Sequence, residues 1–558
     1  MKVLLCAINA KFVHTNLAVR YLREYTKDID YKCDICEFSI NDRIEKVLEL
    51  IMKEKPEIIA FSCYIWNIEM IIKLANLIKK VDRHIEILYG GPEVSYDSES
   101  FLLNNVGEYV IQGEGEETFR EFILYKNGDL GIEGIKGIYY REGNEIKFNG
   151  NRSLMNMDKL PFPYREEESF EHKIIYYESM RGCPFSCKYC LSSTTQGVRF
   201  KNIELVKQEL LRIIKKGVPL VKFVDRTFNC NKKYSREIWT FLMDLSTDTT
   251  FHFEISADLF SEEDIELLSK APKGRFQFEI GVQTTNPKVI TNIDRTMNVQ
   301  ELADIVKKLK RTDNINLHLD LIAGLPEEDF QSFINSFNEV FYMGGDEIQL
   351  GFLKMLKGSL MREETEKWGI IYSDYAPYEI LRSNDISYDE LITLKKVEEI
   401  VDRYYNSGNF RNVMKFMLDG IDNPFNLFFQ FSQLYESMGY FNRNISLADY
   451  YKIILDFNKK YVFKDEQVLK DLIKYDFIRS NKKNWIPEFL SRDIAKDEER
   501  ELKLKFASKN NIETLNRIHL EDFSIDIPMF LNNGLILERR CFYVFLNSNK
   551  LIEEFYYI

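Results

Sequence analysis

The chain has 558 residues, of which 45% are hydrophobic and 29% charged, a composition typical of a globular protein of this length with three or four domains. No segment approaches the roughly 18 consecutive apolar residues of a membrane span. The apolar run at the N-terminus is too short for a signal peptide, so we expect a cytoplasmic protein with no membrane partner. The net charge of −13 argues against non-specific binding of nucleic acid.

Short apolar runs alternate with amphipathic stretches in the first part of the chain, which predicts βαβ units around a parallel sheet. Strands are expected at 3–8, 33–38, 57–63, 85–89 and 109–111, and helices at 17–25, 44–53 and 68–80. Ligands bind such sheets beyond the carboxyl ends of the strands. Those ends carry residues 9–15, 63–67, 90–93 and 113–116.

A second alternation of strands and helices runs from residue 174 to residue 368. Three of its strands, at 251–258, 276–283 and 317–321, are polar at every second position. Alternate side chains of a strand point to opposite faces, so one face of this sheet is apolar and the other polar. The lumen of an ordinary closed barrel is filled by aliphatic side chains. The polar face therefore predicts a wider or incomplete barrel around a cavity for cofactor and substrate.

The remaining segments complete the domain plan. Residues 128–150 are expected to form a small β structure, and Leu160–Pro163 forms a linker. Beyond residue 383 the alternation stops, with helices expected at 389–405 and 426–438 and short strands within 518–545. The predicted fold class is α/β: a doubly wound, Rossmann-like parallel sheet, a partial barrel, and a mostly helical domain with a few strands. The predicted domains are 1–150, 170–375 and 385–558.

Three of the nine cysteines, Cys183, Cys187 and Cys190, lie within eight residues. Three thiolates can hold three irons of a [4Fe–4S] cluster and leave the fourth iron open, whereas ferredoxin-type carriers use four cysteines per cluster. An open iron predicts chemistry rather than electron storage, in a reducing and anaerobic setting. A zinc site would need a fourth ligand, and no cysteine or histidine follows nearby. Zinc and three unligated core cysteines are the weaker alternatives.

This Cys-x3-Cys-x2-Cys spacing, with Tyr189 before the last cysteine, resembles the radical S-adenosylmethionine superfamily. The resemblance implies that the open iron binds S-adenosylmethionine. One electron then splits that cofactor into methionine and a 5′-deoxyadenosyl radical. It also implies a partial (β/α)6 barrel and a flavodoxin- or ferredoxin-type electron donor.

The same resemblance assigns residues around S-adenosylmethionine. Asp320 begins a match to the adenine-contacting fifth strand, although glycine is usual at this position, and Glu279 to Gln283 match the fourth strand. Arg295 stands where relatives keep a basic residue for the methionine carboxylate, and Asp225 replaces an acidic residue of a Gly-Gly-Glu motif. Each could instead be a structural barrel residue. The candidate contacts are Tyr189, Asp225, Glu254, Glu279, Gln283, Arg295, Asp320 and Gly324.

Placed before such a barrel, the N-terminal sheet resembles the cobalamin-binding domain of cobalamin-dependent members of the superfamily. Glycines there let backbone approach the corrin. The Asp-x-His-x-x-Gly pattern that supplies a histidine to cobalt is absent. Cobalamin would then be bound without a histidine on cobalt, and Tyr64 or Trp66 could cover its lower face. The candidate contacts are His14, Thr15, Tyr64, Trp66, Gly90, Gly91, Pro92, Glu93, Gly113, Glu114, Gly115 and Glu116.

The expected reaction is cobalamin-dependent methylation of an unactivated carbon atom of an unknown substrate. One alternative is a cobalamin-linked radical rearrangement or cyclisation without methyl transfer. Another is an enzyme like the methylthiotransferases, in which Cys6, Cys36 and Cys63 would hold a second cluster and the N-terminal domain would bind no cobalamin. A third is that the N-terminal domain is only a scaffold for protein interaction.

Overall fold

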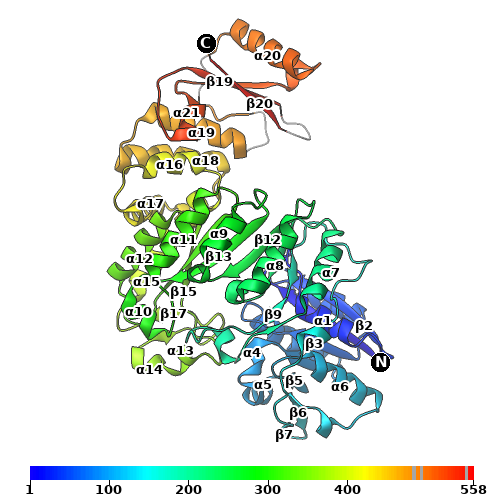
Figure 1. Cartoon of the computed structure of the whole chain (residues 1–558). Helices are drawn as coiled ribbons and strands as arrows, with labels where there is room; N and C mark the ends of the chain where they lie inside the picture. Colours follow the sequence, from blue (N-terminus) through cyan, green and yellow to red (C-terminus); the bar gives the residue numbers. More distant parts are fainter. Residues whose placement is uncertain (196, 481–484, 491–493, 547–550, 558) are drawn as a thin grey trace. The chain divides into compact units, whose positions relative to one another are not determined.

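A computed structural model of the chain describes residues 1–195, 197–480, 485–490, 494–546 and 551–557. It contains two compact units (Figure 1). The first comprises Met1–Asp346 with Leu350–Leu391, and the second comprises Glu347–Gln349 with Ile392–Ile558. Among the described residues, no helix combines the length and apolar character needed to cross a membrane. The predicted boundaries at 150, 170, 375 and 385 stay a prediction.

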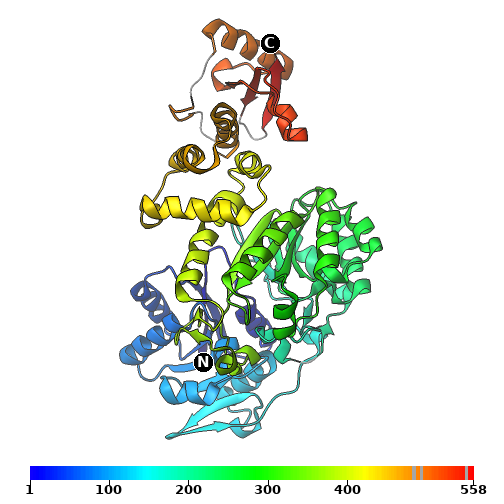
Figure 2. The same ribbon diagram turned by 90° about the vertical axis from the view of Figure 1, so that its left-hand side faces the viewer.

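The first unit begins with a seven-stranded sheet in the order β2-β1-β3-β4-β5-β6-β7. The first five strands pair in parallel, as predicted, and the last two add an antiparallel hairpin at the edge (Figure 2). The strands are β1 (Lys2–Asn9), β2 (Lys32–Ser39), β3 (Ile58–Ser62), β4 (Glu86–Gly90), β5 (Tyr109–Ile111), β6 (Ile138–Glu142) and β7 (Glu145–Phe148).

Helices cover both faces of this sheet, as the interior strand β1, which is apolar on both faces, requires. In β1, Leu4, Cys6 and Ile8 enter one core with α2 and α3. Val3 and Leu5 enter the other core with α1 and α6. The helices are α1 (Leu17–Tyr25), α2 (Ile44–Lys53), α3 (Ile68–Val81), α4 (Pro92–Ser95), α5 (Ser98–Asn104) and α6 (Glu116–Asn127).

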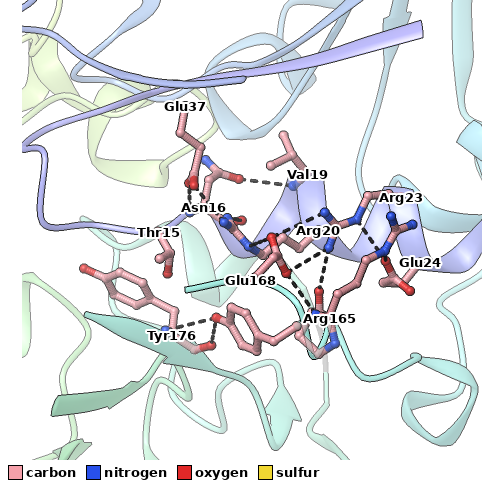
Figure 3. Close-up of polar contacts among 12 residues, drawn as sticks. Thr15, Asn16, Val19, Arg20, Arg23, Glu24, Glu37, Arg165, Glu168 and Tyr176 are labelled. Carbon is pink, nitrogen blue, oxygen red and sulfur yellow. Dashed lines mark hydrogen bonds and ion pairs between the residues drawn. The ribbon is translucent and has the colours of Figure 1, made fainter. Parts of the chain in front are cut away.

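A buried ion-pair network attaches the linker to helix α1 (Figure 3). Arg23 Nη2 lies 3.1 Å from Glu168 Oε2, and Arg165 Nε lies 2.6 Å from Glu24 Oε1. Arg20 pairs with Glu168 at 3.4 Å and with a carboxylate of β2. The side chains of Arg20 and Arg23 are only 6% and 7% exposed. Breaking a buried pair leaves an uncompensated charge, so the network fixes the segment before the barrel.

The second sheet has six strands in the order β15-β14-β13-β12-β11-β8, so β8 and β15 are its two edges and the barrel is incomplete. Burial alternates along β13 and β14, which confirms the predicted alternation. Trp239 of α8 packs on Phe253 and Phe278, so helices cover the apolar face. The strands are β8 (Ile175–Tyr177), β11 (Leu220–Phe223), β12 (Thr250–Ile255), β13 (Phe276–Gln283), β14 (Asn316–Ala323) and β15 (Glu347–Phe352).

The helices of this region follow the strands along the chain (Figure 1). They are α7 (Ile203–Ile214), α8 (Lys232–Met243), α9 (Glu262–Leu268), α10 (Pro287–Asn292), α11 (Val299–Arg311), α12 (Phe330–Met343), α13 (Leu360–Glu363) and α14 (Thr365–Trp368). Two very short strands, β9 (Met180–Arg181) and β10 (Arg199–Phe200), form a separate antiparallel ribbon. We call residues 182–198, which join these two strands, the cluster loop, because it carries Cys183, Cys187 and Cys190.

The second unit is mostly helical and ends in the antiparallel sheet β18-β19-β20, in agreement with the predicted class. Its strands are β18 (His519–Phe523), β19 (Cys541–Leu546) and β20 (Ile552–Tyr557). Its helices include α15 (Tyr388–Val401), α16 (Arg411–Leu418), α17 (Pro424–Ser437), α18 (Leu447–Phe457), α19 (Glu466–Ser480) and α20 (Lys496–Asn510). Helix α21 (Ile527–Asn533) was not predicted; Asp526 caps its N-terminus by accepting from the backbone N–H of Met529 at 3.0 Å.

Candidate active site

A cavity of about 160 Å³ lies beside the cluster loop at the carboxyl ends of the barrel strands. It brings together most of the residues predicted to bind S-adenosylmethionine and the cluster. The lining residues are Cys183, Phe185, Cys187, Tyr189, Cys190, Ser192 and Ser193 of the cluster loop, and Arg226, Thr227, Glu254, Ile255, Ser256, Glu279, Gly281, Gln283, Arg295 and Asp320 of the barrel.

The three thiols open on this cavity without converging on one point. In the described part of the chain, no three His, Cys, Asp or Glu side chains are gathered tightly enough for a single metal ion. Cys187 is buried, and its Sγ lies 3.8 Å from Arg295 Nη1. Cys183 Sγ lies 3.3 Å from Thr227 Oγ1. Three spaced sulfur ligands with a cation beside them are a donor set that fits a thiolate-bound iron–sulfur cluster.

Arg295 connects the cluster loop to the barrel. Its Nη1 donates to Tyr189 Oη at 3.1 Å, and its Nη2 donates to the carbonyl oxygen of Gly281. Its Nε is buried without a hydrogen-bond partner in the described residues. A guanidinium held in this way presents donors to a carboxylate in a fixed geometry. This placement is compatible with the predicted contact to the methionine carboxylate.

Two lumen carboxylates have cationic or imidazole partners. Arg226 Nη1 lies 3.1 and 3.2 Å from the two carboxylate oxygens of Glu254. Burial raises the pKa of Glu254, and Arg226 opposes that shift. Glu279 Oε2 lies 3.0 Å from Nε2 of the buried His252, and this contact lowers the pKa of Glu279. Both side chains point into the lumen, as the alternation of β12 and β13 predicts.

Asp320 differs from these two because no described residue forms a hydrogen bond or ion pair with its carboxyl group, and its Oδ1 is buried. Burial, followed by the nearby charges of Glu279 and Glu254, raises the pKa of Asp320 well above its usual value. A carboxyl group held toward its protonated form can donate as well as accept a hydrogen bond. Asp320 is therefore the lumen carboxyl that is available to a bound molecule.

Two predicted contacts lie away from the cavity. Asp225 is buried and accepts from the backbone N–H groups of Ser179 at 2.9 Å and Met180 at 3.1 Å, so it holds β9 against β11. Burial raises its pKa to about 7. Backbone contacts thus occupy the Asp225 carboxylate, and its contact with S-adenosylmethionine stays a prediction. Gly324 has φ +87°, and a Cβ there would lie 3.0 Å from the side chain of Ile380, so packing and backbone conformation account for this glycine.

Sequence reasoning missed Arg226, Thr227 and Ser256 at the cavity. The first two directly follow Asp225 in the turn after β11, and they line the cavity where Asp225 does not. Ser256 directly follows β12 and continues its polar alternation from Glu254. That alternation was a usable signal for Ser256, whereas the turn carries no periodicity.

The edge at the carboxyl ends of the N-terminal strands is built differently from the cavity, from glycines and one aromatic pair. We call this edge, which carries Gly90, Gly91, Gly113 and Gly115, the glycine edge. Gly91 has φ +114°, and a Cβ there would lie 2.5 Å from the carbonyl oxygen of Cys63. Gly113 has φ +74°, and no described atom lies within 4 Å of the place that a Cβ would take. Trp66 stacks on Tyr64 with ring centroids 4.4 Å apart and is 43% exposed. An accessible turn and an exposed flat aromatic pair are features that fit a large planar ligand such as a corrin.

Of three other predicted contacts of this edge, His14 and Thr15 reach the barrel, whereas Pro92 lies within the edge itself. His14 Nδ1 lies 2.7 Å from Tyr176 Oη, and Thr15 Oγ1 donates to the carbonyl oxygen of Ile174 at 2.9 Å. Burial, with nearby lysines, lowers the pKa of His14. Pro92 occupies the first turn of α4, where its missing N–H is not needed. The contacts of His14 and Thr15 attach the edge of the sheet to β8.

The predicted acidic contacts are also paired with barrel residues. Glu93 pairs with Lys357 at 3.4 Å and accepts from Tyr378 Oη. Glu114 accepts from Arg199 Nη1 at 3.1 Å, and Glu116 lies 2.5 Å from Arg181 Nη2. Gly90 and Gly115 flank these positions on the same edge. The carboxylates therefore hold the two domains together.

The cysteines proposed for a second cluster lie in the apolar core. Cys6 and Cys63 have no exposed surface, and Cys36 packs against them. Burial raises the pKa of Cys36 to about 11 and that of Cys6 well above its usual range. Metal ligation requires the thiolate form. These three thiols behave as small hydrophobic residues.

The domain order of the chain agrees with three family models. Residues 3–123 match the B12 binding domain, residues 177–340 match the Radical SAM superfamily, and residues 366–537 match a protein of unknown function, DUF4080. The fold and the site thus define a radical S-adenosylmethionine enzyme. More narrowly, the chain joins a domain that matches the B12 binding model to a domain that matches the Radical SAM superfamily, followed by a DUF4080 match. Its cofactors are a [4Fe–4S] cluster, S-adenosylmethionine and cobalamin.

Curated relatives match about half of the chain. The uncharacterized methyltransferase PH0819 of Pyrococcus horikoshii is 25% identical over 50% of this chain and 63% of its own length. The 2-(S-pantetheinyl)-carbapenam-3-carboxylate methyltransferase of Streptantibioticus cattleyicolor is 24% identical over 52% of this chain and 46% of its own length. Each alignment therefore spans less than two thirds of the relative.

Solved structures share the fold at low identity. The cobalamin-dependent S-adenosylmethionine radical enzyme OxsB with aqua-cobalamin bound superposes with a TM-score of 0.59 at 14% identity, over 92% of this chain and 84% of OxsB. The radical S-adenosylmethionine methyltransferase TsrM from Kitasatospora setae superposes with a TM-score of 0.57 at 12% identity, over 68% of this chain and 80% of TsrM. The arrangement of the two domains is thus shared with enzymes of this class.

Proposed function

We propose that this enzyme methylates an unactivated carbon atom of its substrate with S-adenosylmethionine and cobalamin. The observation that carries the proposal is that the thiol-lined cavity and the glycine edge of the N-terminal sheet lie in one compact unit, joined by direct ion pairs. Relatives that share about half of the chain are named methyltransferases, which supports methyl transfer as the reaction.

When bound, the cluster supplies one electron to S-adenosylmethionine, and cobalamin supplies a methyl group. The chain positions these groups. Arg295, fixed by Tyr189 and Gly281, is placed to hold the methionine carboxylate. Glu279 accepts hydrogen bonds from the ribose or the methionine amino group. We assign to Thr227, which lies beside Cys183, the contact with S-adenosylmethionine that the sequence predicted for Asp225.

The substrate is proposed to enter the polar lumen, where Asp320 has no protein partner among the described residues. A buried polar group without a partner is costly unless a ligand satisfies it. Asp320 stands where the resemblance to the superfamily leads us to expect glycine, so it adds a hydrogen-bonding group at this position. We propose a flavodoxin- or ferredoxin-type protein as the electron donor.

Isotope labelling tests the proposal. The full-length chain, purified anaerobically with its cluster reconstituted and cobalamin added, is incubated with a metabolite extract and S-adenosylmethionine carrying a labelled methyl group. We expect a labelled small molecule together with 5′-deoxyadenosine. Cys187→Ala should produce neither. Formation of 5′-deoxyadenosine with a new but unlabelled product would contradict methylation.

That last outcome would favour a cobalamin-linked rearrangement or cyclisation. One observation supports this second candidate, and it comes from a curated relative. A relative in Priestia megaterium, 25% identical over 33% of this chain, is named 4′-phospho-dehydrooxetanocin synthase rather than a methyltransferase. The label in the product separates the two candidates directly.

A further inference from the structure

The two ends of the cluster loop lie side by side, at the paired strands β9 and β10. Strands β9 and β10 pair antiparallel, with Arg181 directly opposite Arg199. At the start of the loop, Gly182 has φ +97°, and a side chain there would overlap the carbonyl oxygen of Gly197 near its end. The two ends of the loop are therefore packed tightly against each other, and whatever holds Arg181 and Arg199 holds the base of the loop.

Both arginines are held by one turn of the N-terminal domain. Arg181 Nη2 lies 2.5 Å from Glu116 Oε1, and Arg199 Nη1 lies 3.1 Å from Glu114 Oε2. Arg181 also pairs with Glu178 at 3.0 Å. We call Arg181, Arg199, Glu114 and Glu116 the base clamp. Its side chains are between 7% and 22% exposed, and charge pairs so buried resist rearrangement because separation leaves uncompensated charge.

The turn that supplies the two carboxylates also supplies part of the glycine edge. Gly113 precedes Glu114 directly, and its backbone N–H donates to Ser95 Oγ at 3.2 Å. The space around Gly113 is open. Residues 113–116 thus present backbone to the proposed cofactor surface while their carboxylates hold the cluster loop. A movement of this turn on cofactor binding would be transmitted to both ends of the cluster loop.

We infer that the base clamp couples the cobalamin site to the S-adenosylmethionine site, with Arg181 and Arg199 as positioning residues. Cobalamin bound against residues 113–116 fixes the clamp, the clamp fixes the cluster loop, and S-adenosylmethionine binds more tightly. The inference rests on the cobalamin dependence in the proposed function. Because linkage is reciprocal, S-adenosylmethionine must strengthen cobalamin binding by the same factor.

Binding measurements on the full-length, cluster-reconstituted protein test this coupling without any turnover. Hydroxocobalamin is titrated by its absorbance with and without S-adenosylmethionine, and S-adenosylmethionine is titrated by equilibrium dialysis with and without hydroxocobalamin. In the wild type, each ligand should tighten the other by the same factor, in the range of about 5- to 150-fold. In Arg181→Gln and Arg199→Gln that factor should fall toward one. Arg181→Lys should restore it only in part, because lysine lacks the planar fork of arginine.

Arg23→Gln is the matched control. Arg23 is as buried as the clamp residues and also pairs across the junction of the N-terminal domain and the linker, with Glu168 (Figure 3). Its hydrogen bonds and ion pairs go to Glu24, Pro163 and Glu168, outside both residues 113–116 and the cluster loop. Arg23→Gln should lower the melting temperature while keeping the coupling factor at its wild-type value. Iron content measured on each preparation shows whether the cluster is loaded.

A coupling factor of one in the wild type overturns the inference. So does a wild-type factor in Arg181→Gln and Arg199→Gln when both contain full iron. A loss of coupling in Arg23→Gln equal to that in Arg181→Gln would also overturn it, because a general loosening of the domains would then suffice. Coupled binding in an enzyme that never transfers a methyl group would leave the inference standing and reject the proposed methylation. A wild-type chain that binds no cobalamin would reject both.

Discussion

The two cofactor surfaces of the first unit are built on different physical grounds. The cluster side is a cavity lined by side chains, with thiols, arginines and carboxylates on strands and on one loop. The cobalamin side is an open edge made largely by backbone, where Gly91 and Gly113 adopt positive φ and Tyr64 and Trp66 form a flat surface. We therefore expect the loss of a single side chain to weaken cofactor binding strongly on the cluster side. On the cobalamin side, we expect a larger residue at a glycine to weaken binding more than the loss of a polar side chain.

The largest effect is expected from Cys187→Ala. Removing one of three cluster ligands should abolish 5′-deoxyadenosine formation and lower iron content, because Cys187 is buried at the cavity next to Arg295. Cobalamin binding should persist, since Cys187 lies outside the N-terminal sheet. Iron analysis and chromatography of the reaction mixture measure both. Wild-type cleavage of S-adenosylmethionine by this variant under dithionite would show that the cysteine motif was misassigned.

A smaller effect, on affinity, is expected from Glu279→Ala. Losing a hydrogen bond to a charged group costs about 1.5–3 kcal/mol, which weakens S-adenosylmethionine binding roughly ten- to a hundred-fold. Iron content should stay normal because Glu279 holds no iron. Glu266→Ala, which removes only an exposed pair with Lys270, is the control. An unchanged affinity together with a lower melting temperature and poor iron loading would make Glu279 a structural residue.

On the cobalamin side, Gly113→Asn adds a side chain in the open space of the edge. Asparagine tolerates positive φ, so the fold should remain intact while cobalamin binding weakens by about tenfold, the equivalent of about 1.4 kcal/mol. Gly143→Asn is the control, because Gly143 also has positive φ and open space but lies in the β6–β7 turn. Gly91 is a poor test position, because a Cβ there collides with Cys63. Equal cobalamin affinity in both asparagine variants would place the cofactor elsewhere.

The smallest effect on ligand binding is expected from Asp225→Asn, which should leave S-adenosylmethionine affinity within about twofold. The substitution should instead change how the free energy of unfolding depends on pH. The folded-state pKa of Asp225 is about 7, against 3.8 for the ordinary group, so the folded chain holds a proton that the unfolded chain releases. Stability from this group is therefore present below pH 4 and is lost as pH rises to 7, by up to about 4 kcal/mol.

Melting temperatures of the wild type and Asp225→Asn at pH 5 and pH 8 measure this difference. The wild type should lose stability relative to the variant at the higher pH. Parallel curves for the two proteins would mean that Asp225 does not titrate in this range. A large loss of S-adenosylmethionine affinity in the variant would show that Asp225 does contact this cofactor.

Sequence patterns located regular elements well where a periodic signal exists. Helix α1 and strand β13 begin and end where predicted, because the helical and strand periods are both visible in their sequences. The same alternation identified Glu254, Glu279 and Asp320 as lumen residues. The three-cysteine motif identified the cluster loop because its spacing is local.

What the sequence could not show depends on contacts between distant segments. Strands β9 and β10 are two residues long each, too short for any periodicity. The pair of Glu114 with Arg199 joins residues 85 positions apart, and a carboxylate in a turn has the same local pattern whether it meets an arginine or a cofactor. Asp225 and Thr227 are two residues apart in one turn, and only the folded backbone decides which one reaches the cavity.

The ion-pair network next to α1 limits where the chain can be truncated to give a fragment that folds on its own. Its N-terminal sheet ends at Phe148, but α1 buries Tyr21 against Met155, Met157 and Leu160, and Arg23 relies on Glu168. A fragment cut at residue 150 would expose that apolar patch, favouring aggregation, and would remove Glu168 from Arg20 and Arg23, which would keep only Glu37 and Glu24 as carboxylate partners. The smallest autonomous piece therefore extends past residue 168, so the unit that folds cooperatively is longer than the sheet it contains.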